Sequence, residues 1–153
     1  MGKTQTGAKF QGALPALPCT CANLRRAARA VSRLYNGELQ PHGIEITQLT
    51  LLMALDRVGE ISQGNLGRLL ALDSTTLTRV LKPLRKRGWI EEKTGNDRRF
   101  RMIRLTASGQ AKYQQCLPHW KRAQDRLRAK LGDETAEQLS GLLAKVTATI
   151  AEG

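Results

Sequence analysis

The stretch from residue 73 to residue 88 combines hydrogen-bonding and cationic side chains at helical spacing. Its sequence, DSTTLTRVLKPLRKRG, has one acidic side chain at the start and only basic charges after it. Four polar side chains share one helix face, at intervals of four, three and four residues: Thr75, Arg79, Lys82 and Lys86. Four apolar side chains share the opposite face: Leu77, Val80, Leu81 and Leu84. Because Arg and Lys can donate hydrogen bonds to guanine and Thr can contact the thymine methyl group, such a helix could read the major groove of DNA.

The two ends of this stretch indicate how the helix would be positioned. Asp73 or Ser74 can cap its N-terminus, and Gly88 is the kind of residue that ends a helix. In helix-turn-helix proteins the N-terminal part of the second helix reaches the bases. The side chains expected to read bases are Ser74, Thr75, Thr76 and Arg79, and those expected nearer the phosphates are Lys82 and Lys86.

Immediately downstream, two short segments predict a basic β-hairpin. WIEEKT and RMIRLT are strand candidates, and GNDRR between them is rich in turn-forming residues. Arg98 and Arg99 would lie at the tip, where arginines can enter the minor groove. Asp97 is expected to hold an arginine in place through a bidentate pair. The basic helix alone could equally be a solvated surface, but the adjoining basic hairpin favours DNA binding.

The charge of the chain is concentrated around this helix and hairpin. The chain has 153 residues, with 25 Lys and Arg against 13 Asp and Glu, and its formal net charge is +12. Residues 62–106 alone hold eleven basic and four acidic side chains, whereas residues 107–153 are nearly balanced. An excess of this size implies a polyanionic partner, most often nucleic acid.

The elements before the basic helix are also predicted to be mainly helical. Apolar residues recur at helical spacing after Thr20, which is the expected N-cap of a first helix. The segment QPHG, residues 40–43, is expected to end that helix. A second helix is expected to end near Gly59. The segment EIS, residues 60–62, is predicted to be a short strand or a turn, and Ser62 is placed to cap a third helix.

Helix-forming sequence follows the hairpin, with a kink expected at Pro118 and a break at Gly132. The expected fold class is mainly α: a winged helix-turn-helix with a two-stranded β-wing and terminal dimerisation helices. The predicted organisation is a flexible tail over residues 1–18 and one domain over residues 19–151, with a DNA-binding lobe at residues 44–105 and dimerisation helices at residues 19–40 and 106–151.

The segment LDSTTLTRVLKPLRKRGWIEEKTGNDRRFRMIRLTASGQ, residues 72–110, closely resembles the recognition helix, wing and following segment of MarR-family transcriptional regulators. The likeness extends more loosely over about residues 20–150. It implies a homodimer with intertwined terminal helices, bound to a pseudo-palindromic operator in double-stranded DNA. Within that pattern, the wing aspartate and arginine match Asp97 and Arg99 of this chain.

The three cysteines suggest how such a regulator could be switched. Cys19 and Cys21 lie at the start of the first helix, where the helix N-terminus and nearby arginines create a positive environment that suits a peroxide-reactive thiol. The first helix also resembles that of organic-hydroperoxide-sensing MarR proteins, in which a cysteine, a leucine and a tyrosine match Cys21, Leu24 and Tyr35. It departs from that pattern at Arg25, where a tyrosine is expected. The alternative is that these cysteines pack as small apolar residues.

Two other effectors are compatible with the residues. The residues considered for redox or effector response are Cys21, Cys19, Tyr35 and Cys116, and a less favoured alternative is a metal site made by Cys19, Cys21, Cys116 and His119. The resemblance to MarR-family proteins also implies a small-molecule effector, since such folds often bind aromatic or phenolic anions in a cleft between the dimerisation helices and the DNA-binding lobe. Trp120, Tyr35 and Arg29 could line such a cleft, although large apolar residues at helical spacing are more often core.

Two further function classes compete with a sequence-specific regulator. A non-specific nucleic-acid-binding or architectural protein would use the same charge, but the six aromatic residues do not alternate with the basic run as in single-strand binders. A thiol-dependent redox enzyme is the least favoured reading, because no βαβ context, Gly-rich phosphate loop or paired carboxylates appear. We therefore expect no catalytic residues, no cofactor, no membrane partner and a cytoplasmic location.

Overall fold

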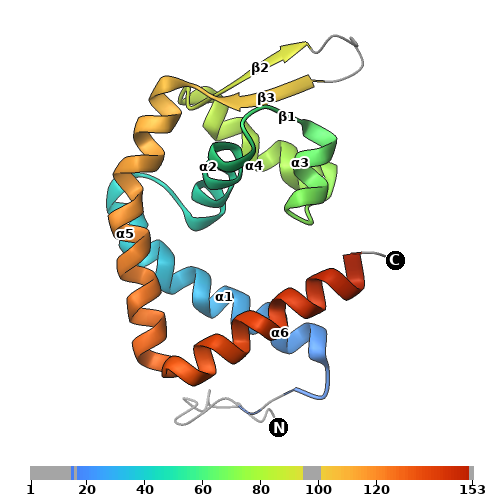
Figure 1. Ribbon diagram of the computed structural model, residues 1–153, viewed down its shortest axis with the longest axis vertical. Coiled ribbons are helices and arrows are strands. Elements are labelled where there is room, and N and C mark those ends of the chain that lie inside the picture. Colours follow the sequence, from blue (N-terminus) through green and yellow to red (C-terminus); the bar gives the residue numbers. More distant parts are fainter. Residues whose placement is uncertain (1–14, 16, 95–100, 152–153) are drawn as a thin grey trace, which may run out of the picture.

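The computed structural model describes residues 15, 17–94 and 101–151 (Figure 1). The elements follow the order α1 (Thr20–Leu39), η1 (Gln40–His42, a 3-10 turn), α2 (Ile46–Val58), β1 (Ile61–Ser62), α3 (Gln63–Leu69), α4 (Ser74–Lys86), β2 (Ile90–Thr94), β3 (Arg101–Leu105), α5 (Ala107–Leu131) and α6 (Asp133–Ala151). The tail predicted over residues 1–18 lies mostly outside the described residues.

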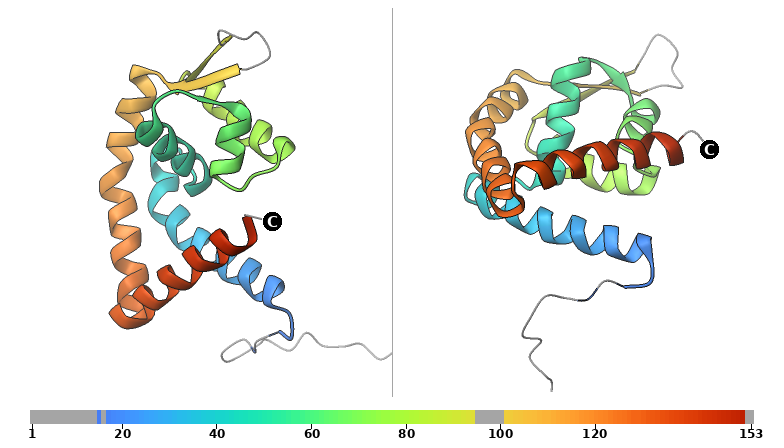
Figure 2. Two further views of the ribbon diagram at one scale, coloured as in Figure 1. Left: turned by 45° about the vertical axis from the view of Figure 1, so that its right-hand side comes forward. Right: turned by 60° about the horizontal axis from the view of Figure 1, so that its bottom comes forward.

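The elements are arranged as a lobe and a set of long helices. Helices α2, α3 and α4 pack beneath the small sheet to form the lobe, and α5 runs from the sheet to the opposite end of the molecule (Figure 1). From there α6 turns back, and α1 and α6 extend to the same side of α5 (Figure 2). Helices α1 and α5 both contact α2 of the lobe, so the lobe lies at one end of a long helical support.

A continuous core passes through both parts. In the lobe, the fully buried apolar side chains come from every helix and from the sheet: Leu49, Leu52, Leu55, Leu66, Leu77, Leu81, Leu84 and Ile103. The core continues between α1 and α5 through Tyr35, Leu39, Tyr113 and Cys116. Each such side chain contributes about 1.5–3 kcal/mol when it leaves water. The core therefore holds the orientation of α4 against α2, α3 and the sheet.

The sheet contains the expected hairpin and one additional strand. Strands β2 and β3 pair antiparallel, with Glu91 opposite Arg104 and Thr94 opposite Arg101. The short strand β1 pairs with the other edge of β3, so the order is β1-β3-β2. The two-stranded wing predicted from the sequence is thus the outer part of a three-stranded sheet. Ile61 opposite Ile103 supplies the apolar contact that keeps β1 in place.

Most of the predicted helix ends agree with the structure. The Ser62 side chain accepts a hydrogen bond from the Asn65 amide at 3.3 Å at the start of α3. At the start of α4, Asp73 rather than Ser74 is the cap. Gly88 follows the end of α4 with φ of +69°, a left-handed conformation that favours glycine.

The predicted cap of the first helix differs, whereas the helix expected to run on through Pro118 does so. The N-cap of α1 is Cys19 and not Thr20, which is already helical, and the Cys19 side chain makes no capping hydrogen bond. Helix α5 continues through Pro118 as a single element that reaches Leu131. Buried residues on both sides of the proline hold α5 against α1 and α2, and this packing outweighs the one backbone hydrogen bond that proline removes.

Candidate nucleic-acid interface

Helix α4 turns its leucines inward and its polar face outward, as its sequence pattern predicts. Leu77, Leu81 and Leu84 are at most 1% exposed, and Val80 is half-buried against them. The predicted contact residues Ser74, Thr75, Arg79, Lys82 and Lys86 are all exposed. The leucines therefore anchor a helix whose cationic side remains open to a large ligand.

Thr76 has a different role from its neighbours. Its amide and its hydroxyl both donate hydrogen bonds to the Asp73 carboxylate, at 2.8 and 2.7 Å. These bonds, led by the one from the amide, hold the pKa of Asp73 below its usual value. The Thr76 hydroxyl is thus engaged in capping the helix, while Ser74 and Thr75 lie exposed beside it.

The turn between α3 and α4 is tight, and it sets the angle at which α4 is presented. The Leu72 amide donates to the Gly67 carbonyl at 2.9 Å, and a Cβ at Gly67 would lie 3.0 Å from the Leu72 carbonyl oxygen. Gln63 on α3 donates to the Thr78 hydroxyl on α4 at 3.2 Å. The two helices therefore form a fixed helix-turn-helix pair.

The base of the hairpin contains acidic residues that the sequence analysis did not single out. The Glu92 carboxylate contacts Arg85 of α4 and lies 3.5 Å from the guanidinium of Arg101 on β3. On the neighbouring position of β2, Glu91 pairs with Arg104 at 2.5 Å. The predicted tip residues Arg98 and Arg99, and the predicted supporting residue Asp97, lie outside the described residues.

A set of contacts around Trp89 joins the lobe to α5. The Thr106 hydroxyl donates to the Gly88 carbonyl at 2.6 Å, and the Thr106 amide donates to the Trp89 carbonyl at 3.1 Å. The cations of Arg87 and Lys112 lie 4.8 and 5.4 Å from the centre of the Trp89 ring. The end of α4 is therefore connected directly to the first turns of α5.

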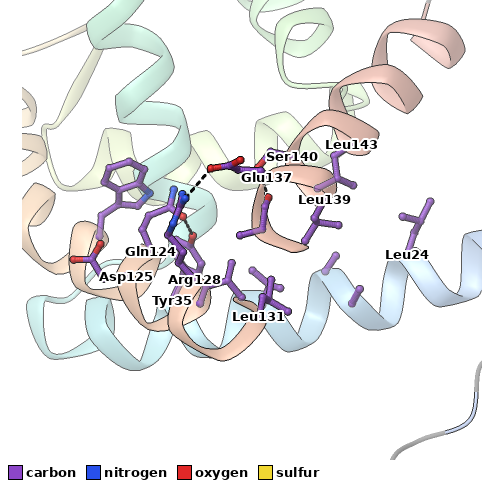
Figure 3. Close-up of a pocket in the computed structure, with 16 residues that line it drawn as sticks. Leu24, Tyr35, Gln124, Asp125, Arg128, Leu131, Glu137, Leu139, Ser140 and Leu143 are labelled. Carbon is purple, nitrogen blue, oxygen red and sulfur yellow. Dashed lines mark hydrogen bonds and ion pairs between the residues drawn. The ribbon is translucent and has the colours of Figure 1, made fainter. Parts of the chain in front are cut away.

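The predicted cleft residues border a different cavity from the one expected. Tyr35 and Trp120 line a cavity of about 760 Å³ between α1, α5 and α6, which we call the helical groove, and Arg29 does not line it (Figure 3). Within it the Tyr35 hydroxyl donates to Gln124 at 2.5 Å, and Arg128 pairs with Glu137 at 2.9 Å. Most of its lining is apolar. The groove lies among the long helices, away from the junction with the lobe.

The cysteines fall into two environments. Cys19 and Cys21 are exposed at the start of α1, whereas Cys116 is fully buried in the core. Burial raises the pKa of the Cys116 thiol, and Lys112 only partly opposes this effect. Cys116 is therefore a protonated core residue with no access for an oxidant, and the thiols that solvent can reach are Cys19 and Cys21.

The alternative metal site is not assembled. Cys116 is in the core and the other two candidate cysteines lie on the surface of α1. In the part of the chain that the structure describes, no group of three or more His, Cys, Asp or Glu side chains is placed to hold a metal ion. His119 instead lies against His42, with ring centroids 3.4 Å apart and the ring planes tilted by 39°.

No helix of the described residues is long and apolar enough to cross a lipid bilayer.

Sequence comparison points to one family of regulators. Residues 42–99 match the family model described as MarR family. The multiple antibiotic resistance protein MarR of Salmonella typhimurium is 34% identical over 111 residues, which cover 72% of this chain and 76% of that protein. The uncharacterised HTH-type transcriptional regulator YwoH of Bacillus subtilis is 28% identical over 119 residues, which cover 78% of this chain and 87% of YwoH.

Solved structures of similar fold include complexes with DNA. The M. tuberculosis transcriptional regulator MOSR in complex with DNA matches with a TM-score of 0.78 and 30% identity, over 86% of this chain and 96% of that one. A mutant MarR from Escherichia coli complexed with operator DNA matches with a TM-score of 0.74 and 28% identity, over 82% of this chain and 91% of that one.

Proposed function

Because this chain belongs to the MarR family of winged-helix transcriptional regulators, we propose that it is a homodimeric repressor that binds a pseudo-palindromic operator and is released by an effector. The observation that carries the proposal is the presentation of α4, whose leucines are buried while its hydroxyl and cationic side chains face outward. Relatives with this fold have been solved in complex with DNA, including one on operator DNA.

The contacts within α4 divide into two kinds. Ser74, Thr75 and Arg79 lie on its N-terminal half, which reaches the base edges in helix-turn-helix proteins. Lys82 and Lys86 lie further along the same face and are placed for phosphates. Thr76 is withdrawn from direct readout because Asp73 holds its hydroxyl. Specificity is therefore assigned to the first half of the helix and general affinity to the second.

Dimerisation is supported by the apolar surface of the long helices. Four large apolar side chains of α6 are exposed: Leu142, Leu143, Val146 and Ile150. Leu143 also borders the helical groove, so the exposed side of α6 adjoins the groove (Figure 3). A second copy packed on these exposed α6 side chains would present two α4 helices, about 34 Å or ten base pairs apart for successive major grooves.

Binding to DNA can be tested with the promoter-proximal fragment of the neighbouring genes, random duplex and single strands. If 6–10 phosphates are contacted, affinity for both duplexes falls about 10³–10⁵-fold between 50 and 200 mM salt. We expect Arg79→Ala to weaken promoter binding selectively, and Lys86→Ala to weaken both duplexes. Lys121→Ala, an exposed cation on α5, is the matched control. Equal affinity of the wild type for promoter and random duplex would favour the non-specific binder instead.

The effector can be sought with the same footprint. Cys21 is exposed in the first turn of α1, so we propose that its oxidation by a hydroperoxide is one route of release. Mild peroxide should then remove protection of the operator in the wild type and in Cys116→Ser, but not in Cys21→Ser. If peroxide leaves the footprint unchanged, an aromatic carboxylate bound in the helical groove is the second candidate, and Trp120 fluorescence would report its binding.

A further inference from the structure

Glu92 occupies an unexpected position for an acidic residue in a DNA-binding lobe. Its side chain is 17% exposed and lies between two arginines from different elements. One carboxylate oxygen contacts Arg85 near the end of α4, and the other lies 3.5 Å from Arg101 at the start of β3. We call these three residues the wing–helix clamp.

The register of the hairpin explains how one carboxylate reaches both arginines. Glu92 is opposite the buried Ile103, and Arg101 is two residues from Ile103 on the same strand. Side chains two apart on a strand share a face, so Glu92 and Arg101 are diagonal neighbours on the face that covers α4. Glu91 is on the opposite face, where it pairs directly with Arg104.

The Glu92 carboxylate is electrostatically unfavourable in a DNA-binding lobe, so its presence there suggests a structural role. Glu92 repels the polyanion that the lobe is proposed to bind, and it withdraws a carboxylate largely from water. It also compensates Arg85, whose Nε atom is buried with no hydrogen-bond partner among the described residues. Arg101, in contrast, is 72% exposed and remains accessible to a ligand while Glu92 holds one side of it.

We propose that Glu92 is a positioning residue for DNA binding, which acts through Arg101. By joining α4 to the wing, it makes the two parts approach the duplex as one unit, and it orients Arg101 toward a backbone phosphate. This inference rests on the proposed function, since it concerns how the same interface recognises an operator.

Positioning and simple charge predict effects of opposite sign. Loss of a negative charge should by itself strengthen binding to any DNA, whereas loss of positioning should weaken operator binding. In Glu92→Gln we expect operator affinity to fall about tenfold, the value of one charge-assisted hydrogen bond. The slope of log affinity against log salt should become shallower by about 0.9, the contribution of one phosphate contact. Affinity for random duplex should fall by a similar factor, because a backbone-phosphate contact carries no sequence information.

Glu91→Gln is the matched control, because it removes the same charge from the adjacent position of β2. We expect it to leave operator affinity and salt slope unchanged or slightly increased. Glu92→Asp keeps the charge but is too short to reach both arginines, so it should lose operator affinity as Glu92→Gln does. Thermal unfolding of each variant identifies any loss that comes from unfolding.

A double-mutant cycle tests whether Glu92 acts through Arg101. Arg101→Ala should weaken operator binding, and Glu92→Gln should add no further loss in the Arg101→Ala background. The proposal is overturned if Glu92→Gln binds the operator as tightly as the wild type or more tightly, or if the two losses are additive. Failure of the wild type to prefer any promoter fragment would instead overturn the proposed function.

Discussion

Gly109, in the first turn of α5, lies against the backbone of Trp89 just after the end of α4. This contact leaves no space for a side chain at position 109. A Cβ at this position would lie 1.9 Å from the Trp89 carbonyl oxygen and 2.8 Å from its carbonyl carbon. That carbonyl accepts the Thr106 amide hydrogen bond, and the Thr106 hydroxyl binds the adjacent Gly88 carbonyl. Both obstructing atoms belong to the backbone, so a rotamer change cannot relieve the clash.

We therefore expect Gly109→Ala to separate the lobe from α5 and to destabilise the protein. Ordinary contact requires a shift of about 1.5 Å, with an overpacking cost of about 1–3 kcal/mol. Loss of the Thr106–Trp89 hydrogen bond adds about 1 kcal/mol. The helix propensity of alanine returns up to about 1 kcal/mol. The net loss is about 1–4 kcal/mol, which for a chain of this size lowers Tm by roughly 2–16 °C.

Thermal unfolding followed by circular dichroism measures this effect, at one protein concentration because association shifts Tm. Gly37→Ala is the matched control: Gly37 lies within α1, and a Cβ there would have no neighbour within 4 Å. That substitution should raise stability by about 0.5–1 kcal/mol through helix propensity alone. A Gly109→Ala variant that melts at or above the wild-type temperature would refute the reasoning.

Two further predictions concern titratable groups. Asp73→Ala removes both hydrogen bonds to Thr76 and should lower Tm at pH 7. The pKa of Asp73 in the folded protein is held below 3.8. The difference in Tm from the wild type should therefore disappear as the pH falls through the pKa of the folded state. Burial, and then the nearby His42 and Arg122, lower the pKa of His119 below 6.5. As the pH falls, the unfolded chain therefore binds a proton at this histidine before the folded protein does. The urea midpoint of unfolding should decrease as the pH falls from 6.5 through the pKa of the folded state. His119→Gln should show a smaller decrease between pH 8 and pH 5, and an unchanged decrease would assign it to other groups.

The features that could be predicted from the sequence are local ones. The spacing of leucines in residues 74–86 was sufficient to identify the inward face of α4, because a helix of 3.6 residues per turn places them together whatever surrounds it. The caps at Ser62 and Asp73 were recognisable because each bonds an amide three residues away. The resemblance over residues 72–110 indicated the family, and the comparisons confirmed it.

Features that depend on distant residues were decided only by the tertiary structure. The pairing of β1 with β3 joins segments about forty residues apart. The two paired residues in EIS carry too short a pattern to predict the partner strand. Buried side chains on both sides of Pro118 hold α5 against its neighbours, and their partners could not be identified from spacing alone. Tyr35 and Trp120 were correctly grouped, but only the path of α6 shows that their cavity lies among the long helices.

The sequence by itself determined which side of α4 faces outward and which family the chain belongs to. Both conclusions depend on residue types at fixed spacings within a short segment of the chain. It did not determine the partners of the acidic residues in the wing. Glu92 looks like an ordinary surface charge until the strand register and the packing of α4 bring Arg85 and Arg101 to its two oxygens. Ion pairs of this kind depend on distances between elements, and only the folded chain sets those distances.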